Sequence, residues 1–171
     1  MPIYLILYVY YKKKDLLLTI NFNMIMIIII ILLILMKYIC IKNLVDPNRL
    51  IIETIRIWIR SMVYDQNPFP ILINLFNNYG VKKTVIPFDD LMGCIALSSN
   101  KKYDFRKVSC NFVGESEQYI LLALYYLQYN KFPITNYYLS NLVNKKFHSC
   151  AFECSKLICK NFTKAGLFFE N

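Results

Sequence analysis

The sequence lacks the short motifs that mark many catalytic sites. It contains no phosphate-binding glycine loop, no G-x-S-x-G nucleophile motif and no H-E-x-x-H metalloprotease motif. The C-x-x-C pair of thiol oxidoreductases is also absent. The adjacent Asp89 and Asp90, in "PFDDLMG", are more typical of a helix cap or a turn than of a general acid. We therefore predict a protein that is not an enzyme, with no cofactor and no small-molecule substrate.

Long runs of basic residues are missing too, although the chain is basic. Its net charge of +9 can indicate binding to nucleic acid or to an anionic membrane surface. The lysines are scattered, however, and the only triplet, Lys12 to Lys14, borders an apolar segment. The many Ile, Asn, Lys, Tyr and Phe residues are those that an AT-rich genome tends to encode. We therefore predict no nucleic-acid partner, and keep a basic nucleic-acid-associated protein as a second alternative.

The N-terminal part contains a long uncharged segment, residues 16–36, "LLLTINFNMIMIIIIILLILM". A helix of this length spans about 30 Å, the thickness of a bilayer's hydrocarbon core, and satisfies its own backbone amides there. No small-x-small signal-peptide cleavage site follows it. We predict a short tail over 1–15 and an uncleaved transmembrane anchor over 16–41. Flanking lysines favour a cytoplasmic N-terminus. Met24 is a second candidate start, which would place residues 1–23 upstream of the protein.

Residues 42–171 are predicted to form one small domain with several helices. Asp46 is a candidate N-cap and Pro47 suits the first turn of a helix, in which Glu53, Arg56 and Arg60 lie opposite an apolar stripe. Gly80 suits the end of a second helix. The predicted helices lie over about 47–64, within "NPFPILINLFNNYG", over 116–130, from Pro133 through "PITNYYLSNLVNKK", and over about 149–160.

Three further segments are predicted to form strands. They are "VKKTVIP", "LMGCIALSS" and "YDFRKVSCNFVG", and in the last of them apolar and polar residues alternate. Strands mixed with helices in this order predict an α+β fold. The predicted architecture is therefore a single N-terminal transmembrane helix followed by a small disulfide-stapled α+β domain.

The cysteines are the candidates for disulfide bonds within this domain. Cys40 lies at the edge of the predicted anchor, and an oxidising compartment would pair the others. Cys150 and Cys154 share a helix face but should not bridge each other easily, so each is expected to reach back to the strand region. An odd number remains, so one thiol stays free, pairs with Cys40 or pairs with another chain. The disulfide candidates are Cys94, Cys110, Cys150, Cys154 and Cys159.

The same C-terminal stretch offers weaker alternatives. His148, Cys150, Cys154 and Cys159 are compressed into one helix-like run, which cannot easily surround one ion, so we predict no metal. His148 and Cys150 would also point about 200° apart on a helix, which suits nucleophilic catalysis poorly. A membrane-tethered thiol oxidoreductase or other enzyme is kept as the first alternative function. Asn161, in Asn-Phe-Thr, is a glycosylation candidate if this end is lumenal.

The overall layout resembles a viral family. It comprises the apolar "MIMIIIIILLILM", then "VYDQNPFPILINLFNNYGVKKTVIPFDDLMGC", then "VSCNFVG", an apolar helix and a cysteine-bearing end. This is similar to the per os infectivity factors of baculoviruses and nudiviruses, in particular the fourth factor, a small N-terminally anchored envelope protein of occlusion-derived virions. The resemblance covers the layout of most of the chain and involves no diagnostic motif. Poxvirus entry-fusion components share the plan of an anchor and a disulfide-bonded domain.

Membership would imply a function in viral entry. The protein would be a membrane-anchored envelope protein of an insect DNA virus and a non-enzymatic component of a multi-protein host-cell entry complex used in oral infection. It would be a single-pass protein of the virion envelope or host membrane, with its C-terminal domain outside the cytosol. Its partners would be the lipid bilayer, other envelope proteins of the complex and the host-cell surface. The resemblance carries over no catalytic residues.

Overall fold

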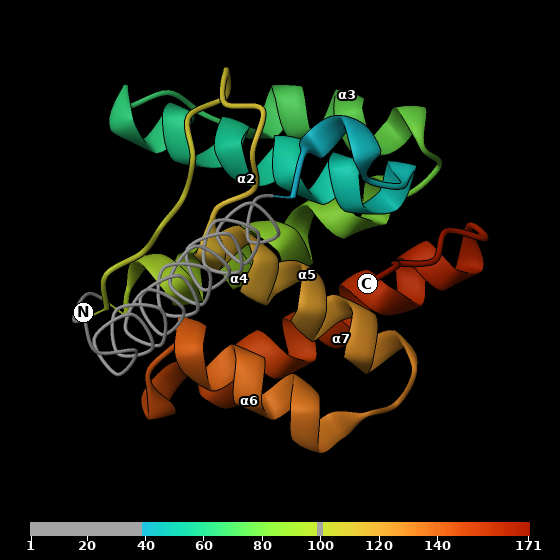
Figure 1. The fold of residues 1–171 in the computed structure, drawn as a ribbon. Coiled ribbons are helices and arrows are strands. Elements are labelled where there is room, and N and C mark those ends of the chain that lie inside the picture. The colour runs from blue at the N-terminus through green and yellow to red at the C-terminus, as the bar shows by residue number, and fades with distance from the viewer. Residues whose placement is uncertain (1–38, 99–100) are drawn as a thin grey trace, which may run out of the picture. The chain divides into compact units, whose positions relative to one another are not determined.

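Helices and their connections make up the part of the chain that the computed structural model describes, residues 39–98 and 101–171 (Figure 1). Ile39–Asn171 is one unit by its internal contacts. It contains six α-helices and three short 3₁₀ helices. Their bounds are η1 Ile41–Asn43, α2 Asp46–Val63, α3 Phe69–Asn78, η2 Lys82–Thr84, α4 Val85–Ala96, α5 Glu115–Gln128, α6 Phe132–Leu142, η3 Lys145–Phe147 and α7 His148–Lys164.

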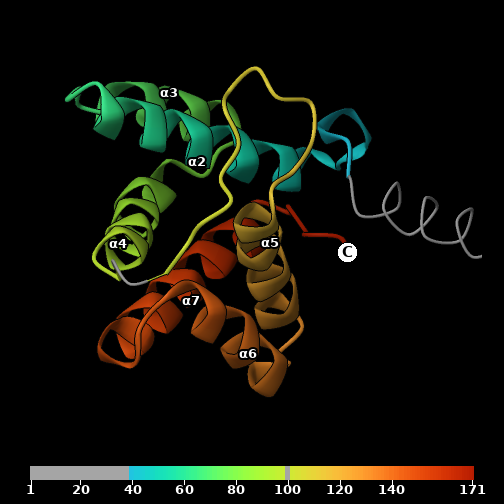
Figure 2. The same cartoon turned by 60° about the vertical axis from the view of Figure 1, so that its left-hand side comes forward.

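The helices pack in neighbouring pairs. Helices α2 and α3 lie together on one side of the unit, and α5 and α6 form an antiparallel hairpin on the other (Figures 1 and 2). Helix α7 packs against both α4 and α5, and α4 contacts α2 and α3, so α4 and α7 together connect the two pairs. A long connection, drawn in yellow, runs from α4 past α2 before it enters α5 (Figure 2).

An aromatic chain runs through the core. The ring of Phe76 in α3 meets Phe88 of α4 at 5.5 Å and Phe162 of α7 at 6.4 Å, both edge-to-face. Phe162 in turn stacks at 4.9 Å on Phe169, in the tail that follows α7. All four rings are fully buried. Aromatic side chains bury the largest apolar areas, so this chain fixes three helices and the C-terminal tail to one another.

Five predicted helices are confirmed, three of them with a predicted local signal, although Asp46 is the first residue of α2 and its N-cap is Val45. Pro47 lies in the first turn of α2 and Pro133 in the first turn of α6, where a missing N–H costs nothing. Gly80 follows α3 with φ +73°, a conformation that favours glycine. The helices predicted over 116–130 and 149–160 correspond to α5 and α7.

The α+β prediction is wrong, because the described residues contain no strand. The segments "VKKTVIP" and "LMGCIALSS", predicted as strands, form η2 and α4. Short apolar runs do not distinguish a strand from a buried helix. Here Val85, Phe88, Met92 and Ile95 recur at helical spacing and are buried, and Pro87 falls in the first turn, where a helix tolerates it.

The third predicted strand, "YDFRKVSCNFVG", is an irregular segment with a single β-bridge. That bridge joins Cys40 and Phe112 in antiparallel orientation. Ile41 N–H donates to Asn111 O, and Val113 N–H donates to Ile39 O, both at 2.9 Å. No strand among the described residues extends this pairing into a sheet, so the alternating pattern alone does not make a ladder.

The predicted single-pass topology and virion-envelope localisation are contradicted as well. Over residues 39–98 and 101–171, no helix combines the length and the apolar character that crossing a membrane requires. The tail predicted over 1–15 and residues 16–38 of the anchor predicted over 16–41 lie outside the described residues. The last residues of that predicted anchor include the β-bridge at Cys40 and the start of η1.

Candidate functional site

A buried ion pair organises one side of the unit. Arg56 of α2 donates from Nε and Nη2 to the two carboxylate oxygens of Glu117 in α5, both at 2.8 Å. The two side chains are 2% and 0% exposed. Arg56 also donates to the carbonyl oxygens of Cys110 at 2.5 Å and Phe112 at 2.7 Å. A single guanidinium therefore ties α2 both to α5 and to the segment that precedes α5.

Glu117 completes the attachment of that segment. Its carboxylate accepts hydrogen bonds from the backbone N–H of Arg106 at 3.1 Å and of Gly114 at 2.7 Å. Gly114 leaves no room for a side chain, because a Cβ there would lie 2.1 Å from the carbonyl oxygen of Asp104. The segment over 104–114 is thus held close to the start of α5 by backbone contacts.

Between this segment and the C-terminal half of α2 lies a groove with a volume of about 590 Å³, which we call the α2 groove. Its walls include apolar side chains, among them Val63, which is 72% exposed, and Val108, which is 49% exposed. No acidic residue lines it. The lining residues are Arg56, Ile59, Arg60, Val63, Tyr64, Phe105, Arg106, Lys107, Val108 and Ser109.

The α2 groove carries unneutralised positive charge. Arg56 is neutralised by Glu117, and Arg106 Nη2 donates to Asp104 at 2.9 Å. Arg60 and Lys107 are exposed, and no carboxylate of the described residues pairs with either. An apolar wall beside unpaired cations is the arrangement that binds an acidic, partly apolar ligand.

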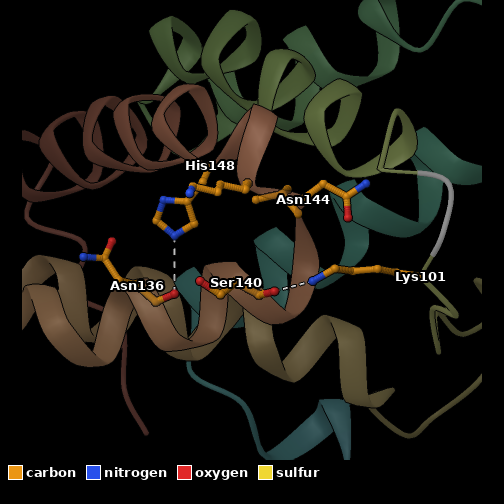
Figure 3. Close-up of a pocket in the computed structure, with 7 residues that line it drawn as sticks. Lys101, Asn136, Ser140, Asn144 and His148 are labelled. Atoms are coloured by element: carbon orange, nitrogen blue, oxygen red, sulfur yellow. Dashed lines mark hydrogen bonds between the residues drawn. The ribbon is translucent and has the colours of Figure 1, made fainter.

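A second pocket, of about 440 Å³, lies beside α6 and contains the only histidine of the chain (Figure 3). His148 Nε2 lies 3.4 Å from the carbonyl oxygen of Asn136, and Lys101 Nζ donates to the carbonyl oxygen of Ser140. Burial lowers the pKa of Lys101. Two of the nitrogen-bearing side chains of this pocket, those of Lys101 and His148, therefore face carbonyl oxygens of α6, which favours a structural role for them.

The predicted disulfide candidates separate into one cluster and two isolated thiols. All six cysteines of the chain are free thiols. The thiol of Cys150 in α7 lies close enough to those of Cys94 in α4 and Cys154 in α7 to raise the pKa of each. Cys110 lies in the segment before α5, where its carbonyl oxygen accepts from Arg56. Cys159 donates to the carbonyl oxygen of Leu124 at 3.3 Å, at the α7–α5 contact.

The environment of these thiols disfavours thiol catalysis. Burial, with hydrogen bonding to Cys150, raises the pKa of Cys94 to about 12. Burial and the neighbouring Cys150 raise the pKa of Cys154 to about 12, and burial alone does so for Cys159. Nucleophilic cysteines have a lowered pKa. In the part of the chain described here, no group of His, Cys, Asp and Glu side chains is arranged to hold a metal ion.

The remaining candidate residues, the two aspartates and the glycosylation triplet, make contacts within the fold. Asp89 and Asp90 lie inside α4 and do not cap it, and Asp89 accepts a hydrogen bond from the indole of Trp58 at 2.7 Å. Asn161 is half-buried within α7, whereas glycan acceptors are expected in surface loops. The hydroxyl of Thr163 in the same triplet accepts from the Gln128 side chain at 2.9 Å.

Sequence reasoning missed the Arg56–Glu117 pair and the α2 groove. The spacing of apolar residues in α2 assigns Arg56 to the polar face, whereas the structure buries it. One signal was present, because Glu117 stands three residues after Gly114, the spacing of a capping box. The usual Ser or Thr at the first position is replaced by glycine, which weakens that signal. The groove joins residues that are far apart in the chain, so no local pattern predicts it.

A comparison of the chain with family models, with curated proteins and with solved structures finds no match.

Proposed function

We propose that the protein is a non-enzymatic interaction module that binds an acidic, partly apolar segment of a partner protein in the α2 groove. The observation that carries this proposal is the pairing of exposed, unneutralised Arg60 and Lys107 with the exposed apolar side chains of Val63 and Val108 in one groove. Exposed apolar patches rimmed by polar residues are typical of interaction sites.

The chemistry of the α2 groove selects the partner's side chains. Arg60 and Arg106 present planar guanidinium groups, which bind carboxylates in two-point geometry, and Lys107 adds a point charge. Apolar side chains of the same segment would contact Val63 and Val108, where burying them gains free energy. The volume of about 590 Å³ suits a few side chains of a peptide rather than a folded domain surface.

The assembly that we propose is the one that the resemblance in layout implies, a multi-protein entry complex of an insect virus. Its other proteins are the candidate donors of the acidic segment. The α2 groove supports a binding role of this kind because it offers recognition without a reactive group. The raised pKa values of Cys94, Cys154 and Cys159 favour a non-enzymatic function over that of a thiol oxidoreductase, because catalytic thiols have a lowered pKa.

Fluorescence anisotropy with short labelled peptides tests this proposal. The probe peptide alternates Glu with Leu, one comparison peptide alternates Lys with Leu, and another alternates Glu with Ser. We expect the Glu-Leu peptide to bind most tightly, because it alone matches both the charge and the apolar wall. Added salt should weaken this binding, since exposed charges are screened.

Charge-reversal variants locate the site. The double variant Arg60→Glu with Lys107→Glu should weaken binding of the Glu-Leu peptide by about tenfold or more, since each exposed pair is worth up to about 1 kcal/mol and becomes a repulsion. Lys83→Glu is the matched control, because Lys83 is exposed and does not line the groove. Equal weakening by the control, or tighter binding of a short oligothymidylate than of the Glu-Leu peptide, would refute the proposal.

A further inference from the structure

The three clustered thiols lie at the contact between α4 and α7. These two helices pack side by side (Figure 2). Cys94 is near the C-terminal end of α4, and Cys150 and Cys154 lie one turn apart near the start of α7. Residues four apart on a helix share a face, so both α7 cysteines are directed to the same neighbour. The cluster therefore joins two elements that are separated by more than fifty positions in the chain.

Exposure distinguishes the members of this cluster. Cys94 and Cys154 are 6% and 7% exposed, whereas Cys150 belongs to the exposed residues. The thiol of Cys150 lies close enough to the other two to raise their pKa values. A reagent in solution thus meets Cys150 first, and a sulfur attached to Cys150 lies beside a second protein thiol. Exposure gives a disulfide in solution access to a thiol, and a neighbouring thiol can then resolve the mixed disulfide that forms.

We propose that Cys150 is a site of thiol–disulfide exchange with low-molecular-weight disulfides of the glutathione type, and that Cys94 resolves the mixed disulfide to a Cys94–Cys150 bridge between α4 and α7. The bridge adds a covalent link to a helix contact that already exists.

The exchange is balanced in two steps. The Cys150 thiolate attacks one sulfur of oxidised glutathione, whose S–S bond breaks as the new S–S bond forms. The departing glutathione thiolate takes up the proton that Cys150 has lost. The Cys94 thiolate then attacks the Cys150 sulfur and expels the second glutathione, which takes up the proton from Cys94. Two protein thiols are oxidised to one disulfide, and one glutathione disulfide is reduced to two thiols.

Helix geometry selects Cys94 over Cys154 as the resolving thiol. Cys150 and Cys154 lie one turn apart on a regular helix, and a bridge between them would strain the preferred disulfide geometry. Cys94 approaches from a separate helix and is free of that constraint. Burial raises the pKa of Cys94 to about 12, so little of it is thiolate near neutral pH. The second step is therefore the slow one, and the mixed disulfide should accumulate before the bridge forms.

Mass spectrometry of the full chain follows both steps. The reduced protein is incubated with oxidised glutathione, and samples are quenched with acid, alkylated, weighed intact and mapped as peptides. We expect one glutathione on Cys150 first, followed by its loss as a Cys94–Cys150 bridge appears. In Cys94→Ser the mixed disulfide on Cys150 should persist for about tenfold longer or more. In Cys150→Ser neither product should form on the same timescale.

Cys110→Ser is the matched control, since Cys110 is half-buried and lies outside the cluster, and it should behave as the unchanged protein. First modification at Cys40 or Cys110, a bridge between Cys150 and Cys154, or an unchanged lifetime of the mixed disulfide in Cys94→Ser would each overturn the proposal. Far-UV circular dichroism checks that the variants fold. If Cys94→Ser does not fold, Cys94→Ala replaces it, and the peptide map of the unchanged protein tests the order of modification and the bridge by itself.

Discussion

Replacing Glu117 with Gln isolates the charge of the buried ion pair, because the two side chains have nearly the same shape. Each carboxylate oxygen of Glu117 accepts two hydrogen bonds. Oε1 accepts from Arg56 Nε and from the backbone N–H of Arg106, and Oε2 accepts from Arg56 Nη2 and from the backbone N–H of Gly114. A glutamine amide group cannot accept, so either orientation of Gln loses two of these bonds and directs N–H groups at two donors.

We expect a large loss in the free energy of unfolding, because the ion pair is buried away from solvent. Arg56 and Glu117 are 2% and 0% exposed, so the guanidinium would keep its charge without the opposite charge that offsets its burial. Removing one partner of a buried ion pair typically costs about 3–5 kcal/mol of the free energy of unfolding. The retained bonds from Arg56 to the carbonyl oxygens of Cys110 and Phe112 place the expectation at the lower end, about 3 kcal/mol.

Urea unfolding followed by far-UV circular dichroism measures this loss, with Glu53→Gln as the control. Glu53 is exposed on α2, and its substitution should change the free energy of unfolding by less than about 0.5 kcal/mol. A loss below about 1 kcal/mol in Glu117→Gln would refute the reasoning that a desolvated charge pair holds this region.

Three further predictions concern single positions. Gly114→Ala should lower the free energy of unfolding by about 1–3 kcal/mol in urea, because its Cβ would meet the carbonyl oxygen of Asp104 at 2.1 Å. Asp89→Asn should cost about 1–2 kcal/mol and shift the fluorescence of Trp58, the only tryptophan, because a charge-assisted hydrogen bond is weakened. Burial raises the pKa of Cys159 from 9.0 to about 12, so its contribution to stability is complete below pH 9 and is lost as the pH rises towards 12. The free energy of unfolding should therefore fall between these pH values more steeply than in Cys159→Ala, by about 1.4 kcal/mol per pH unit, in urea titrations.

The helices could be predicted where the helical spacing of apolar residues agrees with residues that mark the start or end of a helix. Pro47 and Pro133 mark helix starts and Gly80 marks a helix end, and each apolar stripe between such marks is long enough to exclude a strand. Helix α4 could not be predicted in this way. It is short, it is buried by α7 and α3, and its sequence contains Gly93 and the β-branched Val85, so local preference and tertiary packing disagree. Packing determines the outcome, as it does for most helical segments of this length.

The candidate sites differ in the same way: local spacing predicts part of the cysteine cluster, whereas the α2 groove depends on tertiary packing. Helical spacing places Cys150 and Cys154 on one face and predicts that they reach back to Cys94, and the structure brings these three thiols together. Cys110 was an equal candidate on the premise of a sheet, and it lies elsewhere because the sheet does not form. The α2 groove depends on Arg60 and Lys107, which are brought together only when the segment before α5 folds back along α2. No residue spacing in the sequence predicts that this segment packs back against α2.

The ion pair and the α2 groove are physically coupled, and this coupling separates two explanations of binding. Arg56 lines the groove, but its charge is cancelled by Glu117. In Glu117→Gln the groove therefore gains positive charge, while the segment that forms its wall loses one of its two backbone hydrogen bonds to residue 117. If charge alone governs the affinity for the Glu-Leu peptide, this variant should bind it more tightly. If the apolar wall must be in place, the same variant should bind it less tightly despite the added charge. We expect weaker binding, because exposed charges contribute little without the apolar contact that excludes water around them.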